Sequence, residues 1–296
     1  MISGLGFFLV VSMTCLSWIL ARRQSPFVIL WQALRRFLFE ASYRGPILAL
    51  VALLALDMLE SRFDAALTVW LGYDLTGVIH RLEGDWAAQL QRLAWFPAIC
   101  FFTFFYIVMF PVILVAPLFL AAAADDLRSV RMLTVAGVIN YVVCFPFYFF
   151  FPVREMWSGS PDMVRLLVDQ LSPAILQAYR TTSALDNCFP SFHTSLSLTV
   201  ALLAGRLGPR PFAVAIRVTA GVILASTLYL GIHWACDVAA GAALALLASR
   251  MARTWCRARP VTCVRQKCGL SRLIGNVPWF RQQEQERRSS NQPKPG

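Results

Sequence analysis

Two of the three histidines in this 296-residue sequence lie in local patterns that suit them to chemistry on an anion. His233 is followed four residues later by Asp237, so on a helix the carboxylate would hold one ring nitrogen and leave the other basic. Such an imidazole serves as a nucleophile or as a general base. His193 follows Pro190 and Ser191, which together signal a helix start whose free N–H groups bind phosphate. The pattern predicts a phosphoryl-transfer site.

The elements that must position these residues are membrane-spanning helices. The chain is 58% hydrophobic and only 15% charged, although its formal net charge is +11. A soluble domain has about a quarter of its residues charged, so the composition argues against a soluble nucleic-acid-binding protein and against a disordered chain. It predicts an all-α, polytopic membrane bundle of six to seven helices. Apolar runs of spanning length are expected near residues 2–20, 46–59, 96–122, 132–151, 191–205, 213–232 and 235–250.

Three regions follow from these runs. Residues 1–45 are expected to hold the first span and an amphipathic helix lying in the membrane interface. Residues 46–250 form the membrane-embedded domain that carries the histidines. Residues 251–296 are a basic tail, partly disordered. Residues 60–95 and 152–190 are the two long polar segments between spans, and we expect both at the surface.

The charge distribution predicts an orientation. With alternating spans, one side of the membrane collects +16 and the other −5, which sum to the net charge of +11. The basic side, with the tail, is expected to be cytoplasmic. Both histidine patterns then lie at the opposite face, toward the periplasm or lumen of a bacterial-type inner or plasma membrane.

The histidine patterns resemble the type 2 phosphatidic acid phosphatase superfamily. Its Pro-Ser-Gly-His element corresponds to Pro190–His193, and its Ser-Arg-x5-His-x3-Asp element corresponds to Ser226–Asp237, with the spacing kept. The resemblance implies that His233 is the nucleophile, that Asp237 orients it and that His193 protonates the leaving oxygen. Ser191 and the neighbouring backbone N–H groups would hold the phosphate.

Three departures from the superfamily pattern are shared with one of its branches. Phe192 stands where the pattern has glycine, Thr227 where it has arginine, and no Lys-x6-Arg-Pro element precedes residue 190. These features, together with Tyr229-Leu230 and the stretch His80–Gly84, resemble the branch that contains inositol phosphorylceramide synthase. The resemblance covers roughly residues 75–250 and implies a phosphotransferase acting on a phospholipid or sphingolipid-type substrate, with the backbone at Phe192 part of the phosphate site.

Other positive charges must then neutralise the phosphate. Arg154 is the first candidate, because it follows the fourth span at the predicted outer face; Arg180 is the second and Arg165 the third. Each is also accounted for as an interfacial arginine that extends to lipid headgroups.

Several alternatives stay open at this point. Water as acceptor would make the protein a plain lipid phosphate phosphatase, and the missing cations would also suit a catalytically inactive membrane scaffold. We expect no cofactor and no metal, since no Cys/His cluster has ligand spacing, and we expect no nucleic-acid partner. Cys188 and Cys236 are predicted to be small packing residues, with a disulfide as the alternative. The oligomeric state is open.

Overall fold

The computed structural model describes residues 26–84, 86–180, 187–208 and 210–258, without the side chains of residues 26, 61–69, 178 and 180. The predicted first span at residues 2–20 lies outside these ranges, and so does the tail beyond residue 258.

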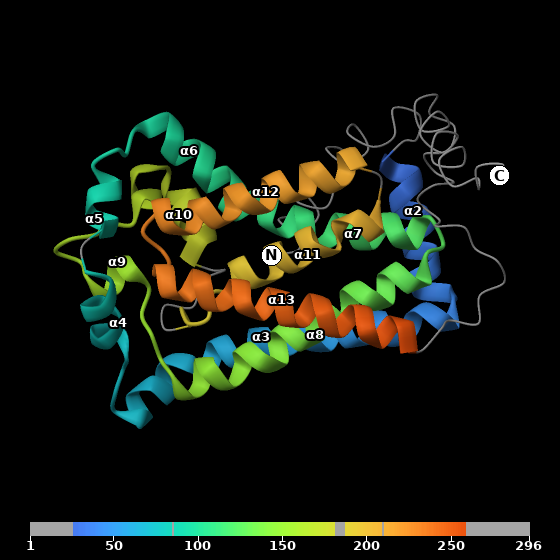
Figure 1. The fold of residues 1–296 in the computed structure, drawn as a ribbon, viewed down its shortest axis with the longest axis horizontal. Helices are drawn as coiled ribbons and strands as arrows, with labels where there is room; N and C mark the ends of the chain where they lie inside the picture. The colour runs from blue at the N-terminus through green and yellow to red at the C-terminus, as the bar shows by residue number, and fades with distance from the viewer. Residues whose placement is uncertain (1–25, 85, 181–186, 209, 259–296) are drawn as a thin grey trace, which may run out of the picture.

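The long helices lie side by side along the long axis of the molecule (Figure 1). The described residues form no strand, and the only strand-like pairing among them is a parallel bridge between Val153 and Asn187. A π-helical turn at Phe105–Met109 joins two of the helices into one continuous rod. The long helices are α3 (Ala41–Leu71), α6 (Phe96–Phe104) with α7 (Phe110–Ala123), α8 (Leu127–Phe150), α11 (Phe192–Leu207), α12 (Arg210–Tyr229) and α13 (Ala235–Ala258).

Five helical stretches in the described part of the chain are long and apolar enough to cross a bilayer: residues 41–60, 96–123, 127–150, 210–229 and 235–258. Helix α11 has 16 residues, fewer than the ~20 that a span needs. It packs against α7, α8, α12 and α13 and lies among them in Figure 1. The chain is an integral membrane protein, and the prediction of an all-α membrane bundle is confirmed.

One end of the bundle carries α2 (Pro26–Phe39), which forms from the segment predicted to be amphipathic and packs against α7. Arg36 of α2 donates to the carbonyl oxygen of Ala122 at 2.8 Å and forms an ion pair with Asp125 at 3.0 Å. These contacts attach α2 to the turn between α7 and α8. With alternating spans, residues 21–45 and 123–131 are both expected on the basic side of the membrane, and they lie at the same end of the bundle.

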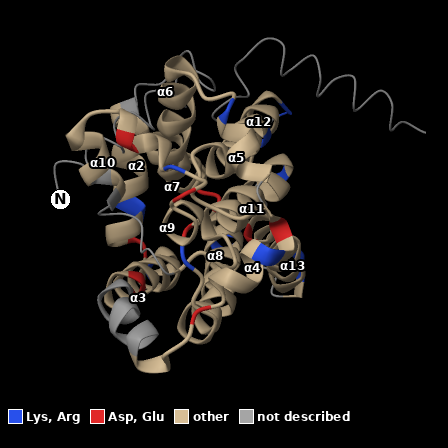
Figure 2. Cartoon of the chain, turned by 90° about the vertical axis from the view of Figure 1, so that its left-hand side faces the viewer, with Lys and Arg blue, Asp and Glu red and all other residues tan. Residues whose placement is uncertain are grey.

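The short helices gather at the other end, onto which Figure 2 looks. They are α4 (Thr76–Glu83), α5 (Trp86–Gln91), α9 (Met156–Gly159), a 3₁₀ turn (Leu167–Gln170) and α10 (Pro173–Arg180). Leu75 N–H donates to Pro152 O at 2.9 Å, and Leu167 N–H donates to Leu230 O at 3.2 Å. The two long polar segments therefore meet at this end, beside the turn between α12 and α13. The first polar segment was predicted to begin at residue 60. Helix α3 instead continues to Leu71, so the non-helical part of this segment begins about three helical turns later.

Close packing of α11 on α13 brings the two halves of the histidine pattern together. A Cβ atom added at Gly241 of α13 would lie 2.5 Å from the carbonyl oxygen of Ser191 and 3.1 Å from Cβ of Thr194. Only glycine allows this approach between the helix that carries Asp237 and the start of the helix that carries His193. Gly241 therefore sets the distance between the two elements of the site.

We expect Gly241→Ala to lower the free energy of unfolding by about 1–3 kcal/mol, because the new methyl group forces the two backbones apart. Gly221→Ala is the matched control, since a Cβ atom there meets nothing within 4 Å and alanine favours the helix by about 1 kcal/mol. Thermal unfolding of both variants in detergent measures the difference. Equal melting temperatures would show that the α11–α13 contact does not need glycine.

Candidate active site

His233 lies in the turn between α12 and α13, and this turn is held by contacts with the end of α12 and with the loop around Arg165. Gly231 adopts a φ of 78°, and a Cβ atom at this position would lie 2.6 Å from Nε2 of Gln91 and 2.7 Å from the carbonyl oxygen of Arg165. The backbone N–H of His233 donates to the carbonyl oxygen of Thr227 at 3.1 Å. The end of α12 and the loop around Arg165 together hold His233 in place, and the residue is 5% exposed.

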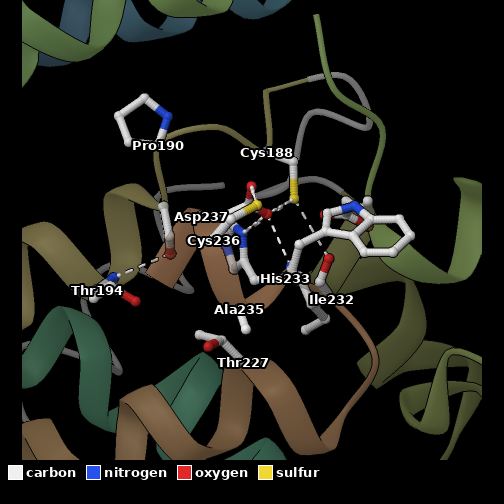
Figure 3. A network of polar contacts seen from close by, with 12 residues as sticks. Cys188, Pro190, Thr194, Thr227, Ile232, His233, Ala235, Cys236 and Asp237 are labelled. Atoms are coloured by element: carbon white, nitrogen blue, oxygen red, sulfur yellow. Dashed lines mark hydrogen bonds and ion pairs between the residues drawn. The ribbon is translucent and has the colours of Figure 1, made fainter. Parts of the chain in front are cut away.

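Asp237 lies in the first turn of α13 and is fully buried. Its Oδ2 is 3.5 Å from Nδ1 of His233, and it accepts a hydrogen bond from the backbone N–H of Trp234 at 2.9 Å (Figure 3). The carboxylate therefore faces one nitrogen of the ring from a fixed position. A proton on Nδ1 is favoured there, which leaves the lone pair on Nε2.

Cys188 is a third member of this group that the sequence analysis assigned to packing. Its Sγ lies 3.1 Å from Nδ1 of His233 and 2.9 Å from Oδ2 of Asp237 (Figure 3). Burial and the neighbouring Asp237 raise the pKa of the Cys188 thiol well above its usual value, so the neutral thiol donates its S–H to the carboxylate. Cys188 is 45 residues from His233 in the chain, and no local spacing pattern points to this contact.

His193 lies in the first turn of α11 with its ring held between two aromatic rings. It stacks on Tyr106 with 4.4 Å between ring centroids, and the Phe110 ring lies 4.2 Å away. The centroid of His193 is 6.0 Å from that of His233. The two imidazoles that the sequence placed at one face are therefore neighbours, and one phosphoryl group can contact both.

Ser191 begins α11 as its N-cap. Its Oγ accepts a hydrogen bond from the N–H of Thr194 at 3.3 Å, and its own N–H donates to the carbonyl oxygen of Asp237 at 3.1 Å. The second bond ties the start of α11 directly to α13. Phe192 turns its ring toward Tyr141 of α8, so at this position only the backbone N–H is available for an anion at the helix start.

The three candidate arginines have different surroundings. Arg154 is exposed, and its Nη2 forms an ion pair with Oδ2 of Asp74 at 2.8 Å, so a phosphate would compete with that carboxylate. Arg165 is held through its backbone, since Gln91 accepts from its N–H at 2.9 Å and donates to its carbonyl oxygen at 2.7 Å. Arg180 ends α10, and its side chain lies outside the described residues.

Glu83 of α4 is a residue whose place in the site the sequence analysis did not identify. Its carboxylate accepts hydrogen bonds from the backbone N–H of Ala235 at 2.8 Å and of Cys236 at 2.5 Å, and from Nε1 of Trp86 at 3.1 Å. A negative charge is favoured at a helix N-terminus, and Glu83 supplies it to α13 from about 150 residues away. The available signal was the stretch His80–Gly84, which contains this glutamate.

We expect Glu83→Gln to lower kcat about tenfold to a hundredfold while KM changes little, because the start of α13 shifts and misplaces Asp237 and His233. Glu40→Gln is the matched control, since Glu40 forms a half-buried i,i+4 pair with Arg36 at the opposite end of the bundle. Steady-state kinetics on both variants separate kcat from KM. An unchanged kcat with a raised KM would mean that Glu83 contributes to substrate binding and does not position α13.

The arrangement supplies one imidazole oriented by a carboxylate, a second imidazole that can move a proton, and a helix start that can bind an anion. Cys188, His233 and Asp237 also form a group of potential metal ligands, with one donor atom each and all three atoms within 4.8 Å of one another. The sequence analysis expected no such group, because the thiol joins the other two donors only through the fold.

Comparison with known proteins identifies a family. Neither curated proteins nor solved structures gave a match to the chain. Residues 74–251, more than half of the sequence, match the PAP2 superfamily. The matched range begins just before α4 and contains Glu83, Cys188, His193 and the His233–Asp237 pair. The chain therefore belongs to the PAP2 superfamily, which confirms the resemblance to the type 2 phosphatidic acid phosphatase superfamily.

Proposed function

We propose that this membrane protein acts on a lipid phosphate ester through a covalent phosphohistidine on His233. The observation that carries the proposal is the pair of imidazole rings 6.0 Å apart, one of them held by the buried Asp237. Nucleophilic catalysis by an oriented imidazole needs such a carboxylate partner. Family membership supports a phosphatase-type reaction in the membrane.

The first step forms a bond between Nε2 of His233 and phosphorus and breaks the bond from phosphorus to the leaving oxygen. His193 gives its proton to that oxygen. The positive charge that develops on the His233 ring is stabilised by Asp237, which faces Nδ1. The Ser191 helix start supplies N–H groups for the phosphoryl oxygens.

His193 can carry that proton only when substrate is present. Tyr106 and Phe110 cover its ring, and such surroundings disfavour a positive charge. An anionic phosphate next to the ring offsets this effect, since an opposite charge within a few ångströms favours the protonated form of the imidazole. Substrate binding would thus prepare the acid that the reaction needs.

In the second step an acceptor oxygen attacks phosphorus, its proton passes to His193, and the bond to Nε2 breaks. Water as acceptor gives a phosphatase, and an alcohol gives a phospho-headgroup transferase. We favour the transferase, because Phe192, Thr227 and the absent Lys-x6-Arg-Pro element resemble the inositol phosphorylceramide synthase branch.

The test uses purified full-length protein in detergent with phospholipids labelled in the phosphate, with and without ceramide, diacylglycerol or a water-soluble polyol as acceptor. We expect labelled phosphate on an added alcohol, and inhibition by vanadate, which mimics the pentacoordinate transition state. Free phosphate as the sole product in every mixture would rule out the transferase and leave the phosphatase. No vanadate-sensitive turnover on any of these lipids would favour the inactive scaffold.

We further propose that the site faces the periplasm or lumen and that the tail is cytoplasmic, because the basic residues collect on the tail side. Reporter domains fused after residue 258 and inserted between α9 and α10 would report opposite sides of the membrane. A tail on the outer side would reverse the assignment.

A further inference from the structure

We propose that Cys188, His233 and Asp237 form an inhibitory binding site for a thiophilic divalent cation, with Zn²⁺ as the ion that fits the donor set. The three residues offer one sulfur, one imidazole nitrogen and one carboxylate oxygen, the ligand types that zinc takes in proteins. All three are buried, which separates this group from the exposed acidic clusters that are common on protein surfaces.

The separations of the donor atoms suit a single ion. Sγ lies 2.9 Å from the carboxylate oxygen and 3.1 Å from Nδ1, and these two lie 3.5 Å from each other. A circle through three atoms so spaced has a radius of about 1.8 Å, which is shorter than zinc bonds of about 2.0–2.3 Å to nitrogen, oxygen and sulfur. One ion can therefore sit just above the plane of the three atoms and bond to all of them, with a fourth position open.

The charge balance of the site and the fixed orientation of Asp237 also favour binding of the ion. Binding releases the thiol proton, and the resulting thiolate and the carboxylate together balance the two positive charges, so the buried site becomes neutral. The oxygen of Asp237 is already oriented by the N–H of Trp234 at 2.9 Å, and such support of a ligand strengthens metal binding.

Inhibition follows from which ring nitrogen the ion uses, and this step rests on the proposed function. Nδ1 of His233 points into the group, so the metal takes the Nδ1 lone pair and the single proton of the neutral ring moves to Nε2. Nε2 then has no lone pair with which to attack phosphorus. Metal binding and formation of phosphohistidine exclude each other.

Binding itself is measured without substrate, by titrating the full-length protein in thiol-free detergent buffer with Co²⁺, which substitutes for Zn²⁺. Cys256, Cys263 and Cys268 are first replaced by serine to remove sulfur ligands near and in the tail. We expect a sulfur-to-cobalt charge-transfer band in this parent protein and in Cys144→Ser, the matched buried control, and no band in Cys188→Ser. His233→Gln should weaken Co²⁺ binding by at least about tenfold, since even a supporting residue changes metal affinity that much.

A parent protein without the band, or a band that survives in Cys188→Ser, overturns the metal site. His233→Gln decides the same question if Cys188→Ser does not fold, because unchanged Co²⁺ affinity in that variant excludes His233 as a ligand.

Turnover tests the inhibitory role separately. Zn²⁺ should inhibit the parent, a metal chelator should restore activity, and the inhibitory concentration should rise at least about tenfold in Cys188→Ser, each variant being compared with its own metal-free rate. Equal inhibition of both proteins would overturn the inhibitory role. If the protein shows no turnover at all, the proposed function fails while the Co²⁺ spectrum still decides the metal site.

Discussion

Replacement of His233 by alanine is expected to lower kcat by at least about a thousandfold, because the atom that bonds to phosphorus is removed. The residue is buried in a turn held by Thr227 and by the glycine at position 231. His193 is not placed to replace it, because the His193 ring packs against Tyr106 and Phe110.

The direct measurement is isolation of the covalent intermediate. Wild-type protein quenched during turnover of phosphate-labelled lipid should carry label that is stable in base and lost in acid, as expected for a phosphoramidate bond. His233→Ala should carry none. His80→Gln replaces the remaining histidine and should keep turnover within a few-fold of wild type, so the comparison separates the nucleophile from a general effect of losing an imidazole. Labelled, active His233→Ala would refute the assignment.

Replacement of Asp237 by asparagine should lower kcat by about 10³- to 10⁴-fold with little change in KM, by analogy with the carboxylate of a serine-protease triad. The amide keeps the shape of the side chain but removes the charge that faces Nδ1 of His233 and accepts from Cys188 and Trp234. The imidazole then loses its preferred tautomer and the charge that balances it in the transition state.

The same variant should unfold at a lower temperature, because a buried acceptor of two hydrogen bonds is weakened, at a cost of about 1–3 kcal/mol. Asp162→Asn is the matched control: this aspartate lies exposed in the second polar segment, and its replacement should leave both kcat and the melting temperature unchanged. A large loss of stability with normal kcat would make Asp237 a structural residue only.

The membrane bundle was predictable because its signals are local. A run of about 20 apolar residues must be helical in a bilayer, since every backbone N–H and C=O group needs a partner within the segment. The His233–Asp237 contact was also predictable, because only four residues separate the two side chains. The sequence analysis assumed that both lie on one helix, whereas His233 lies in the turn before α13 and only Asp237 lies on the helix. The start of α11 was equally visible, since Ser191 caps the helix that Pro190 precedes.

Contacts between distant segments were not predictable in the same way. Cys188 reaches His233 only because α11 and α13 approach closely at Gly241. Glu83 reaches the start of α13 only because the two polar segments fold onto one end of the bundle. Arg154 was expected beside the phosphate because of its place in the chain. In the structure it forms an ion pair with Asp74, a contact that depends on how the segment before α4 packs.

The sequence by itself thus determined the all-α membrane bundle, the family motifs and the close spacing of His233 and Asp237, because each of these depends on neighbours within a few residues. The tertiary structure alone decided which side chains surround the histidines. It places the Cys188 thiol against His233, the Glu83 carboxylate at the start of α13 and the Asp74 carboxylate on Arg154. These contacts depend on close packing between distant segments, as at Gly241, where a single added methyl group would change which atoms meet.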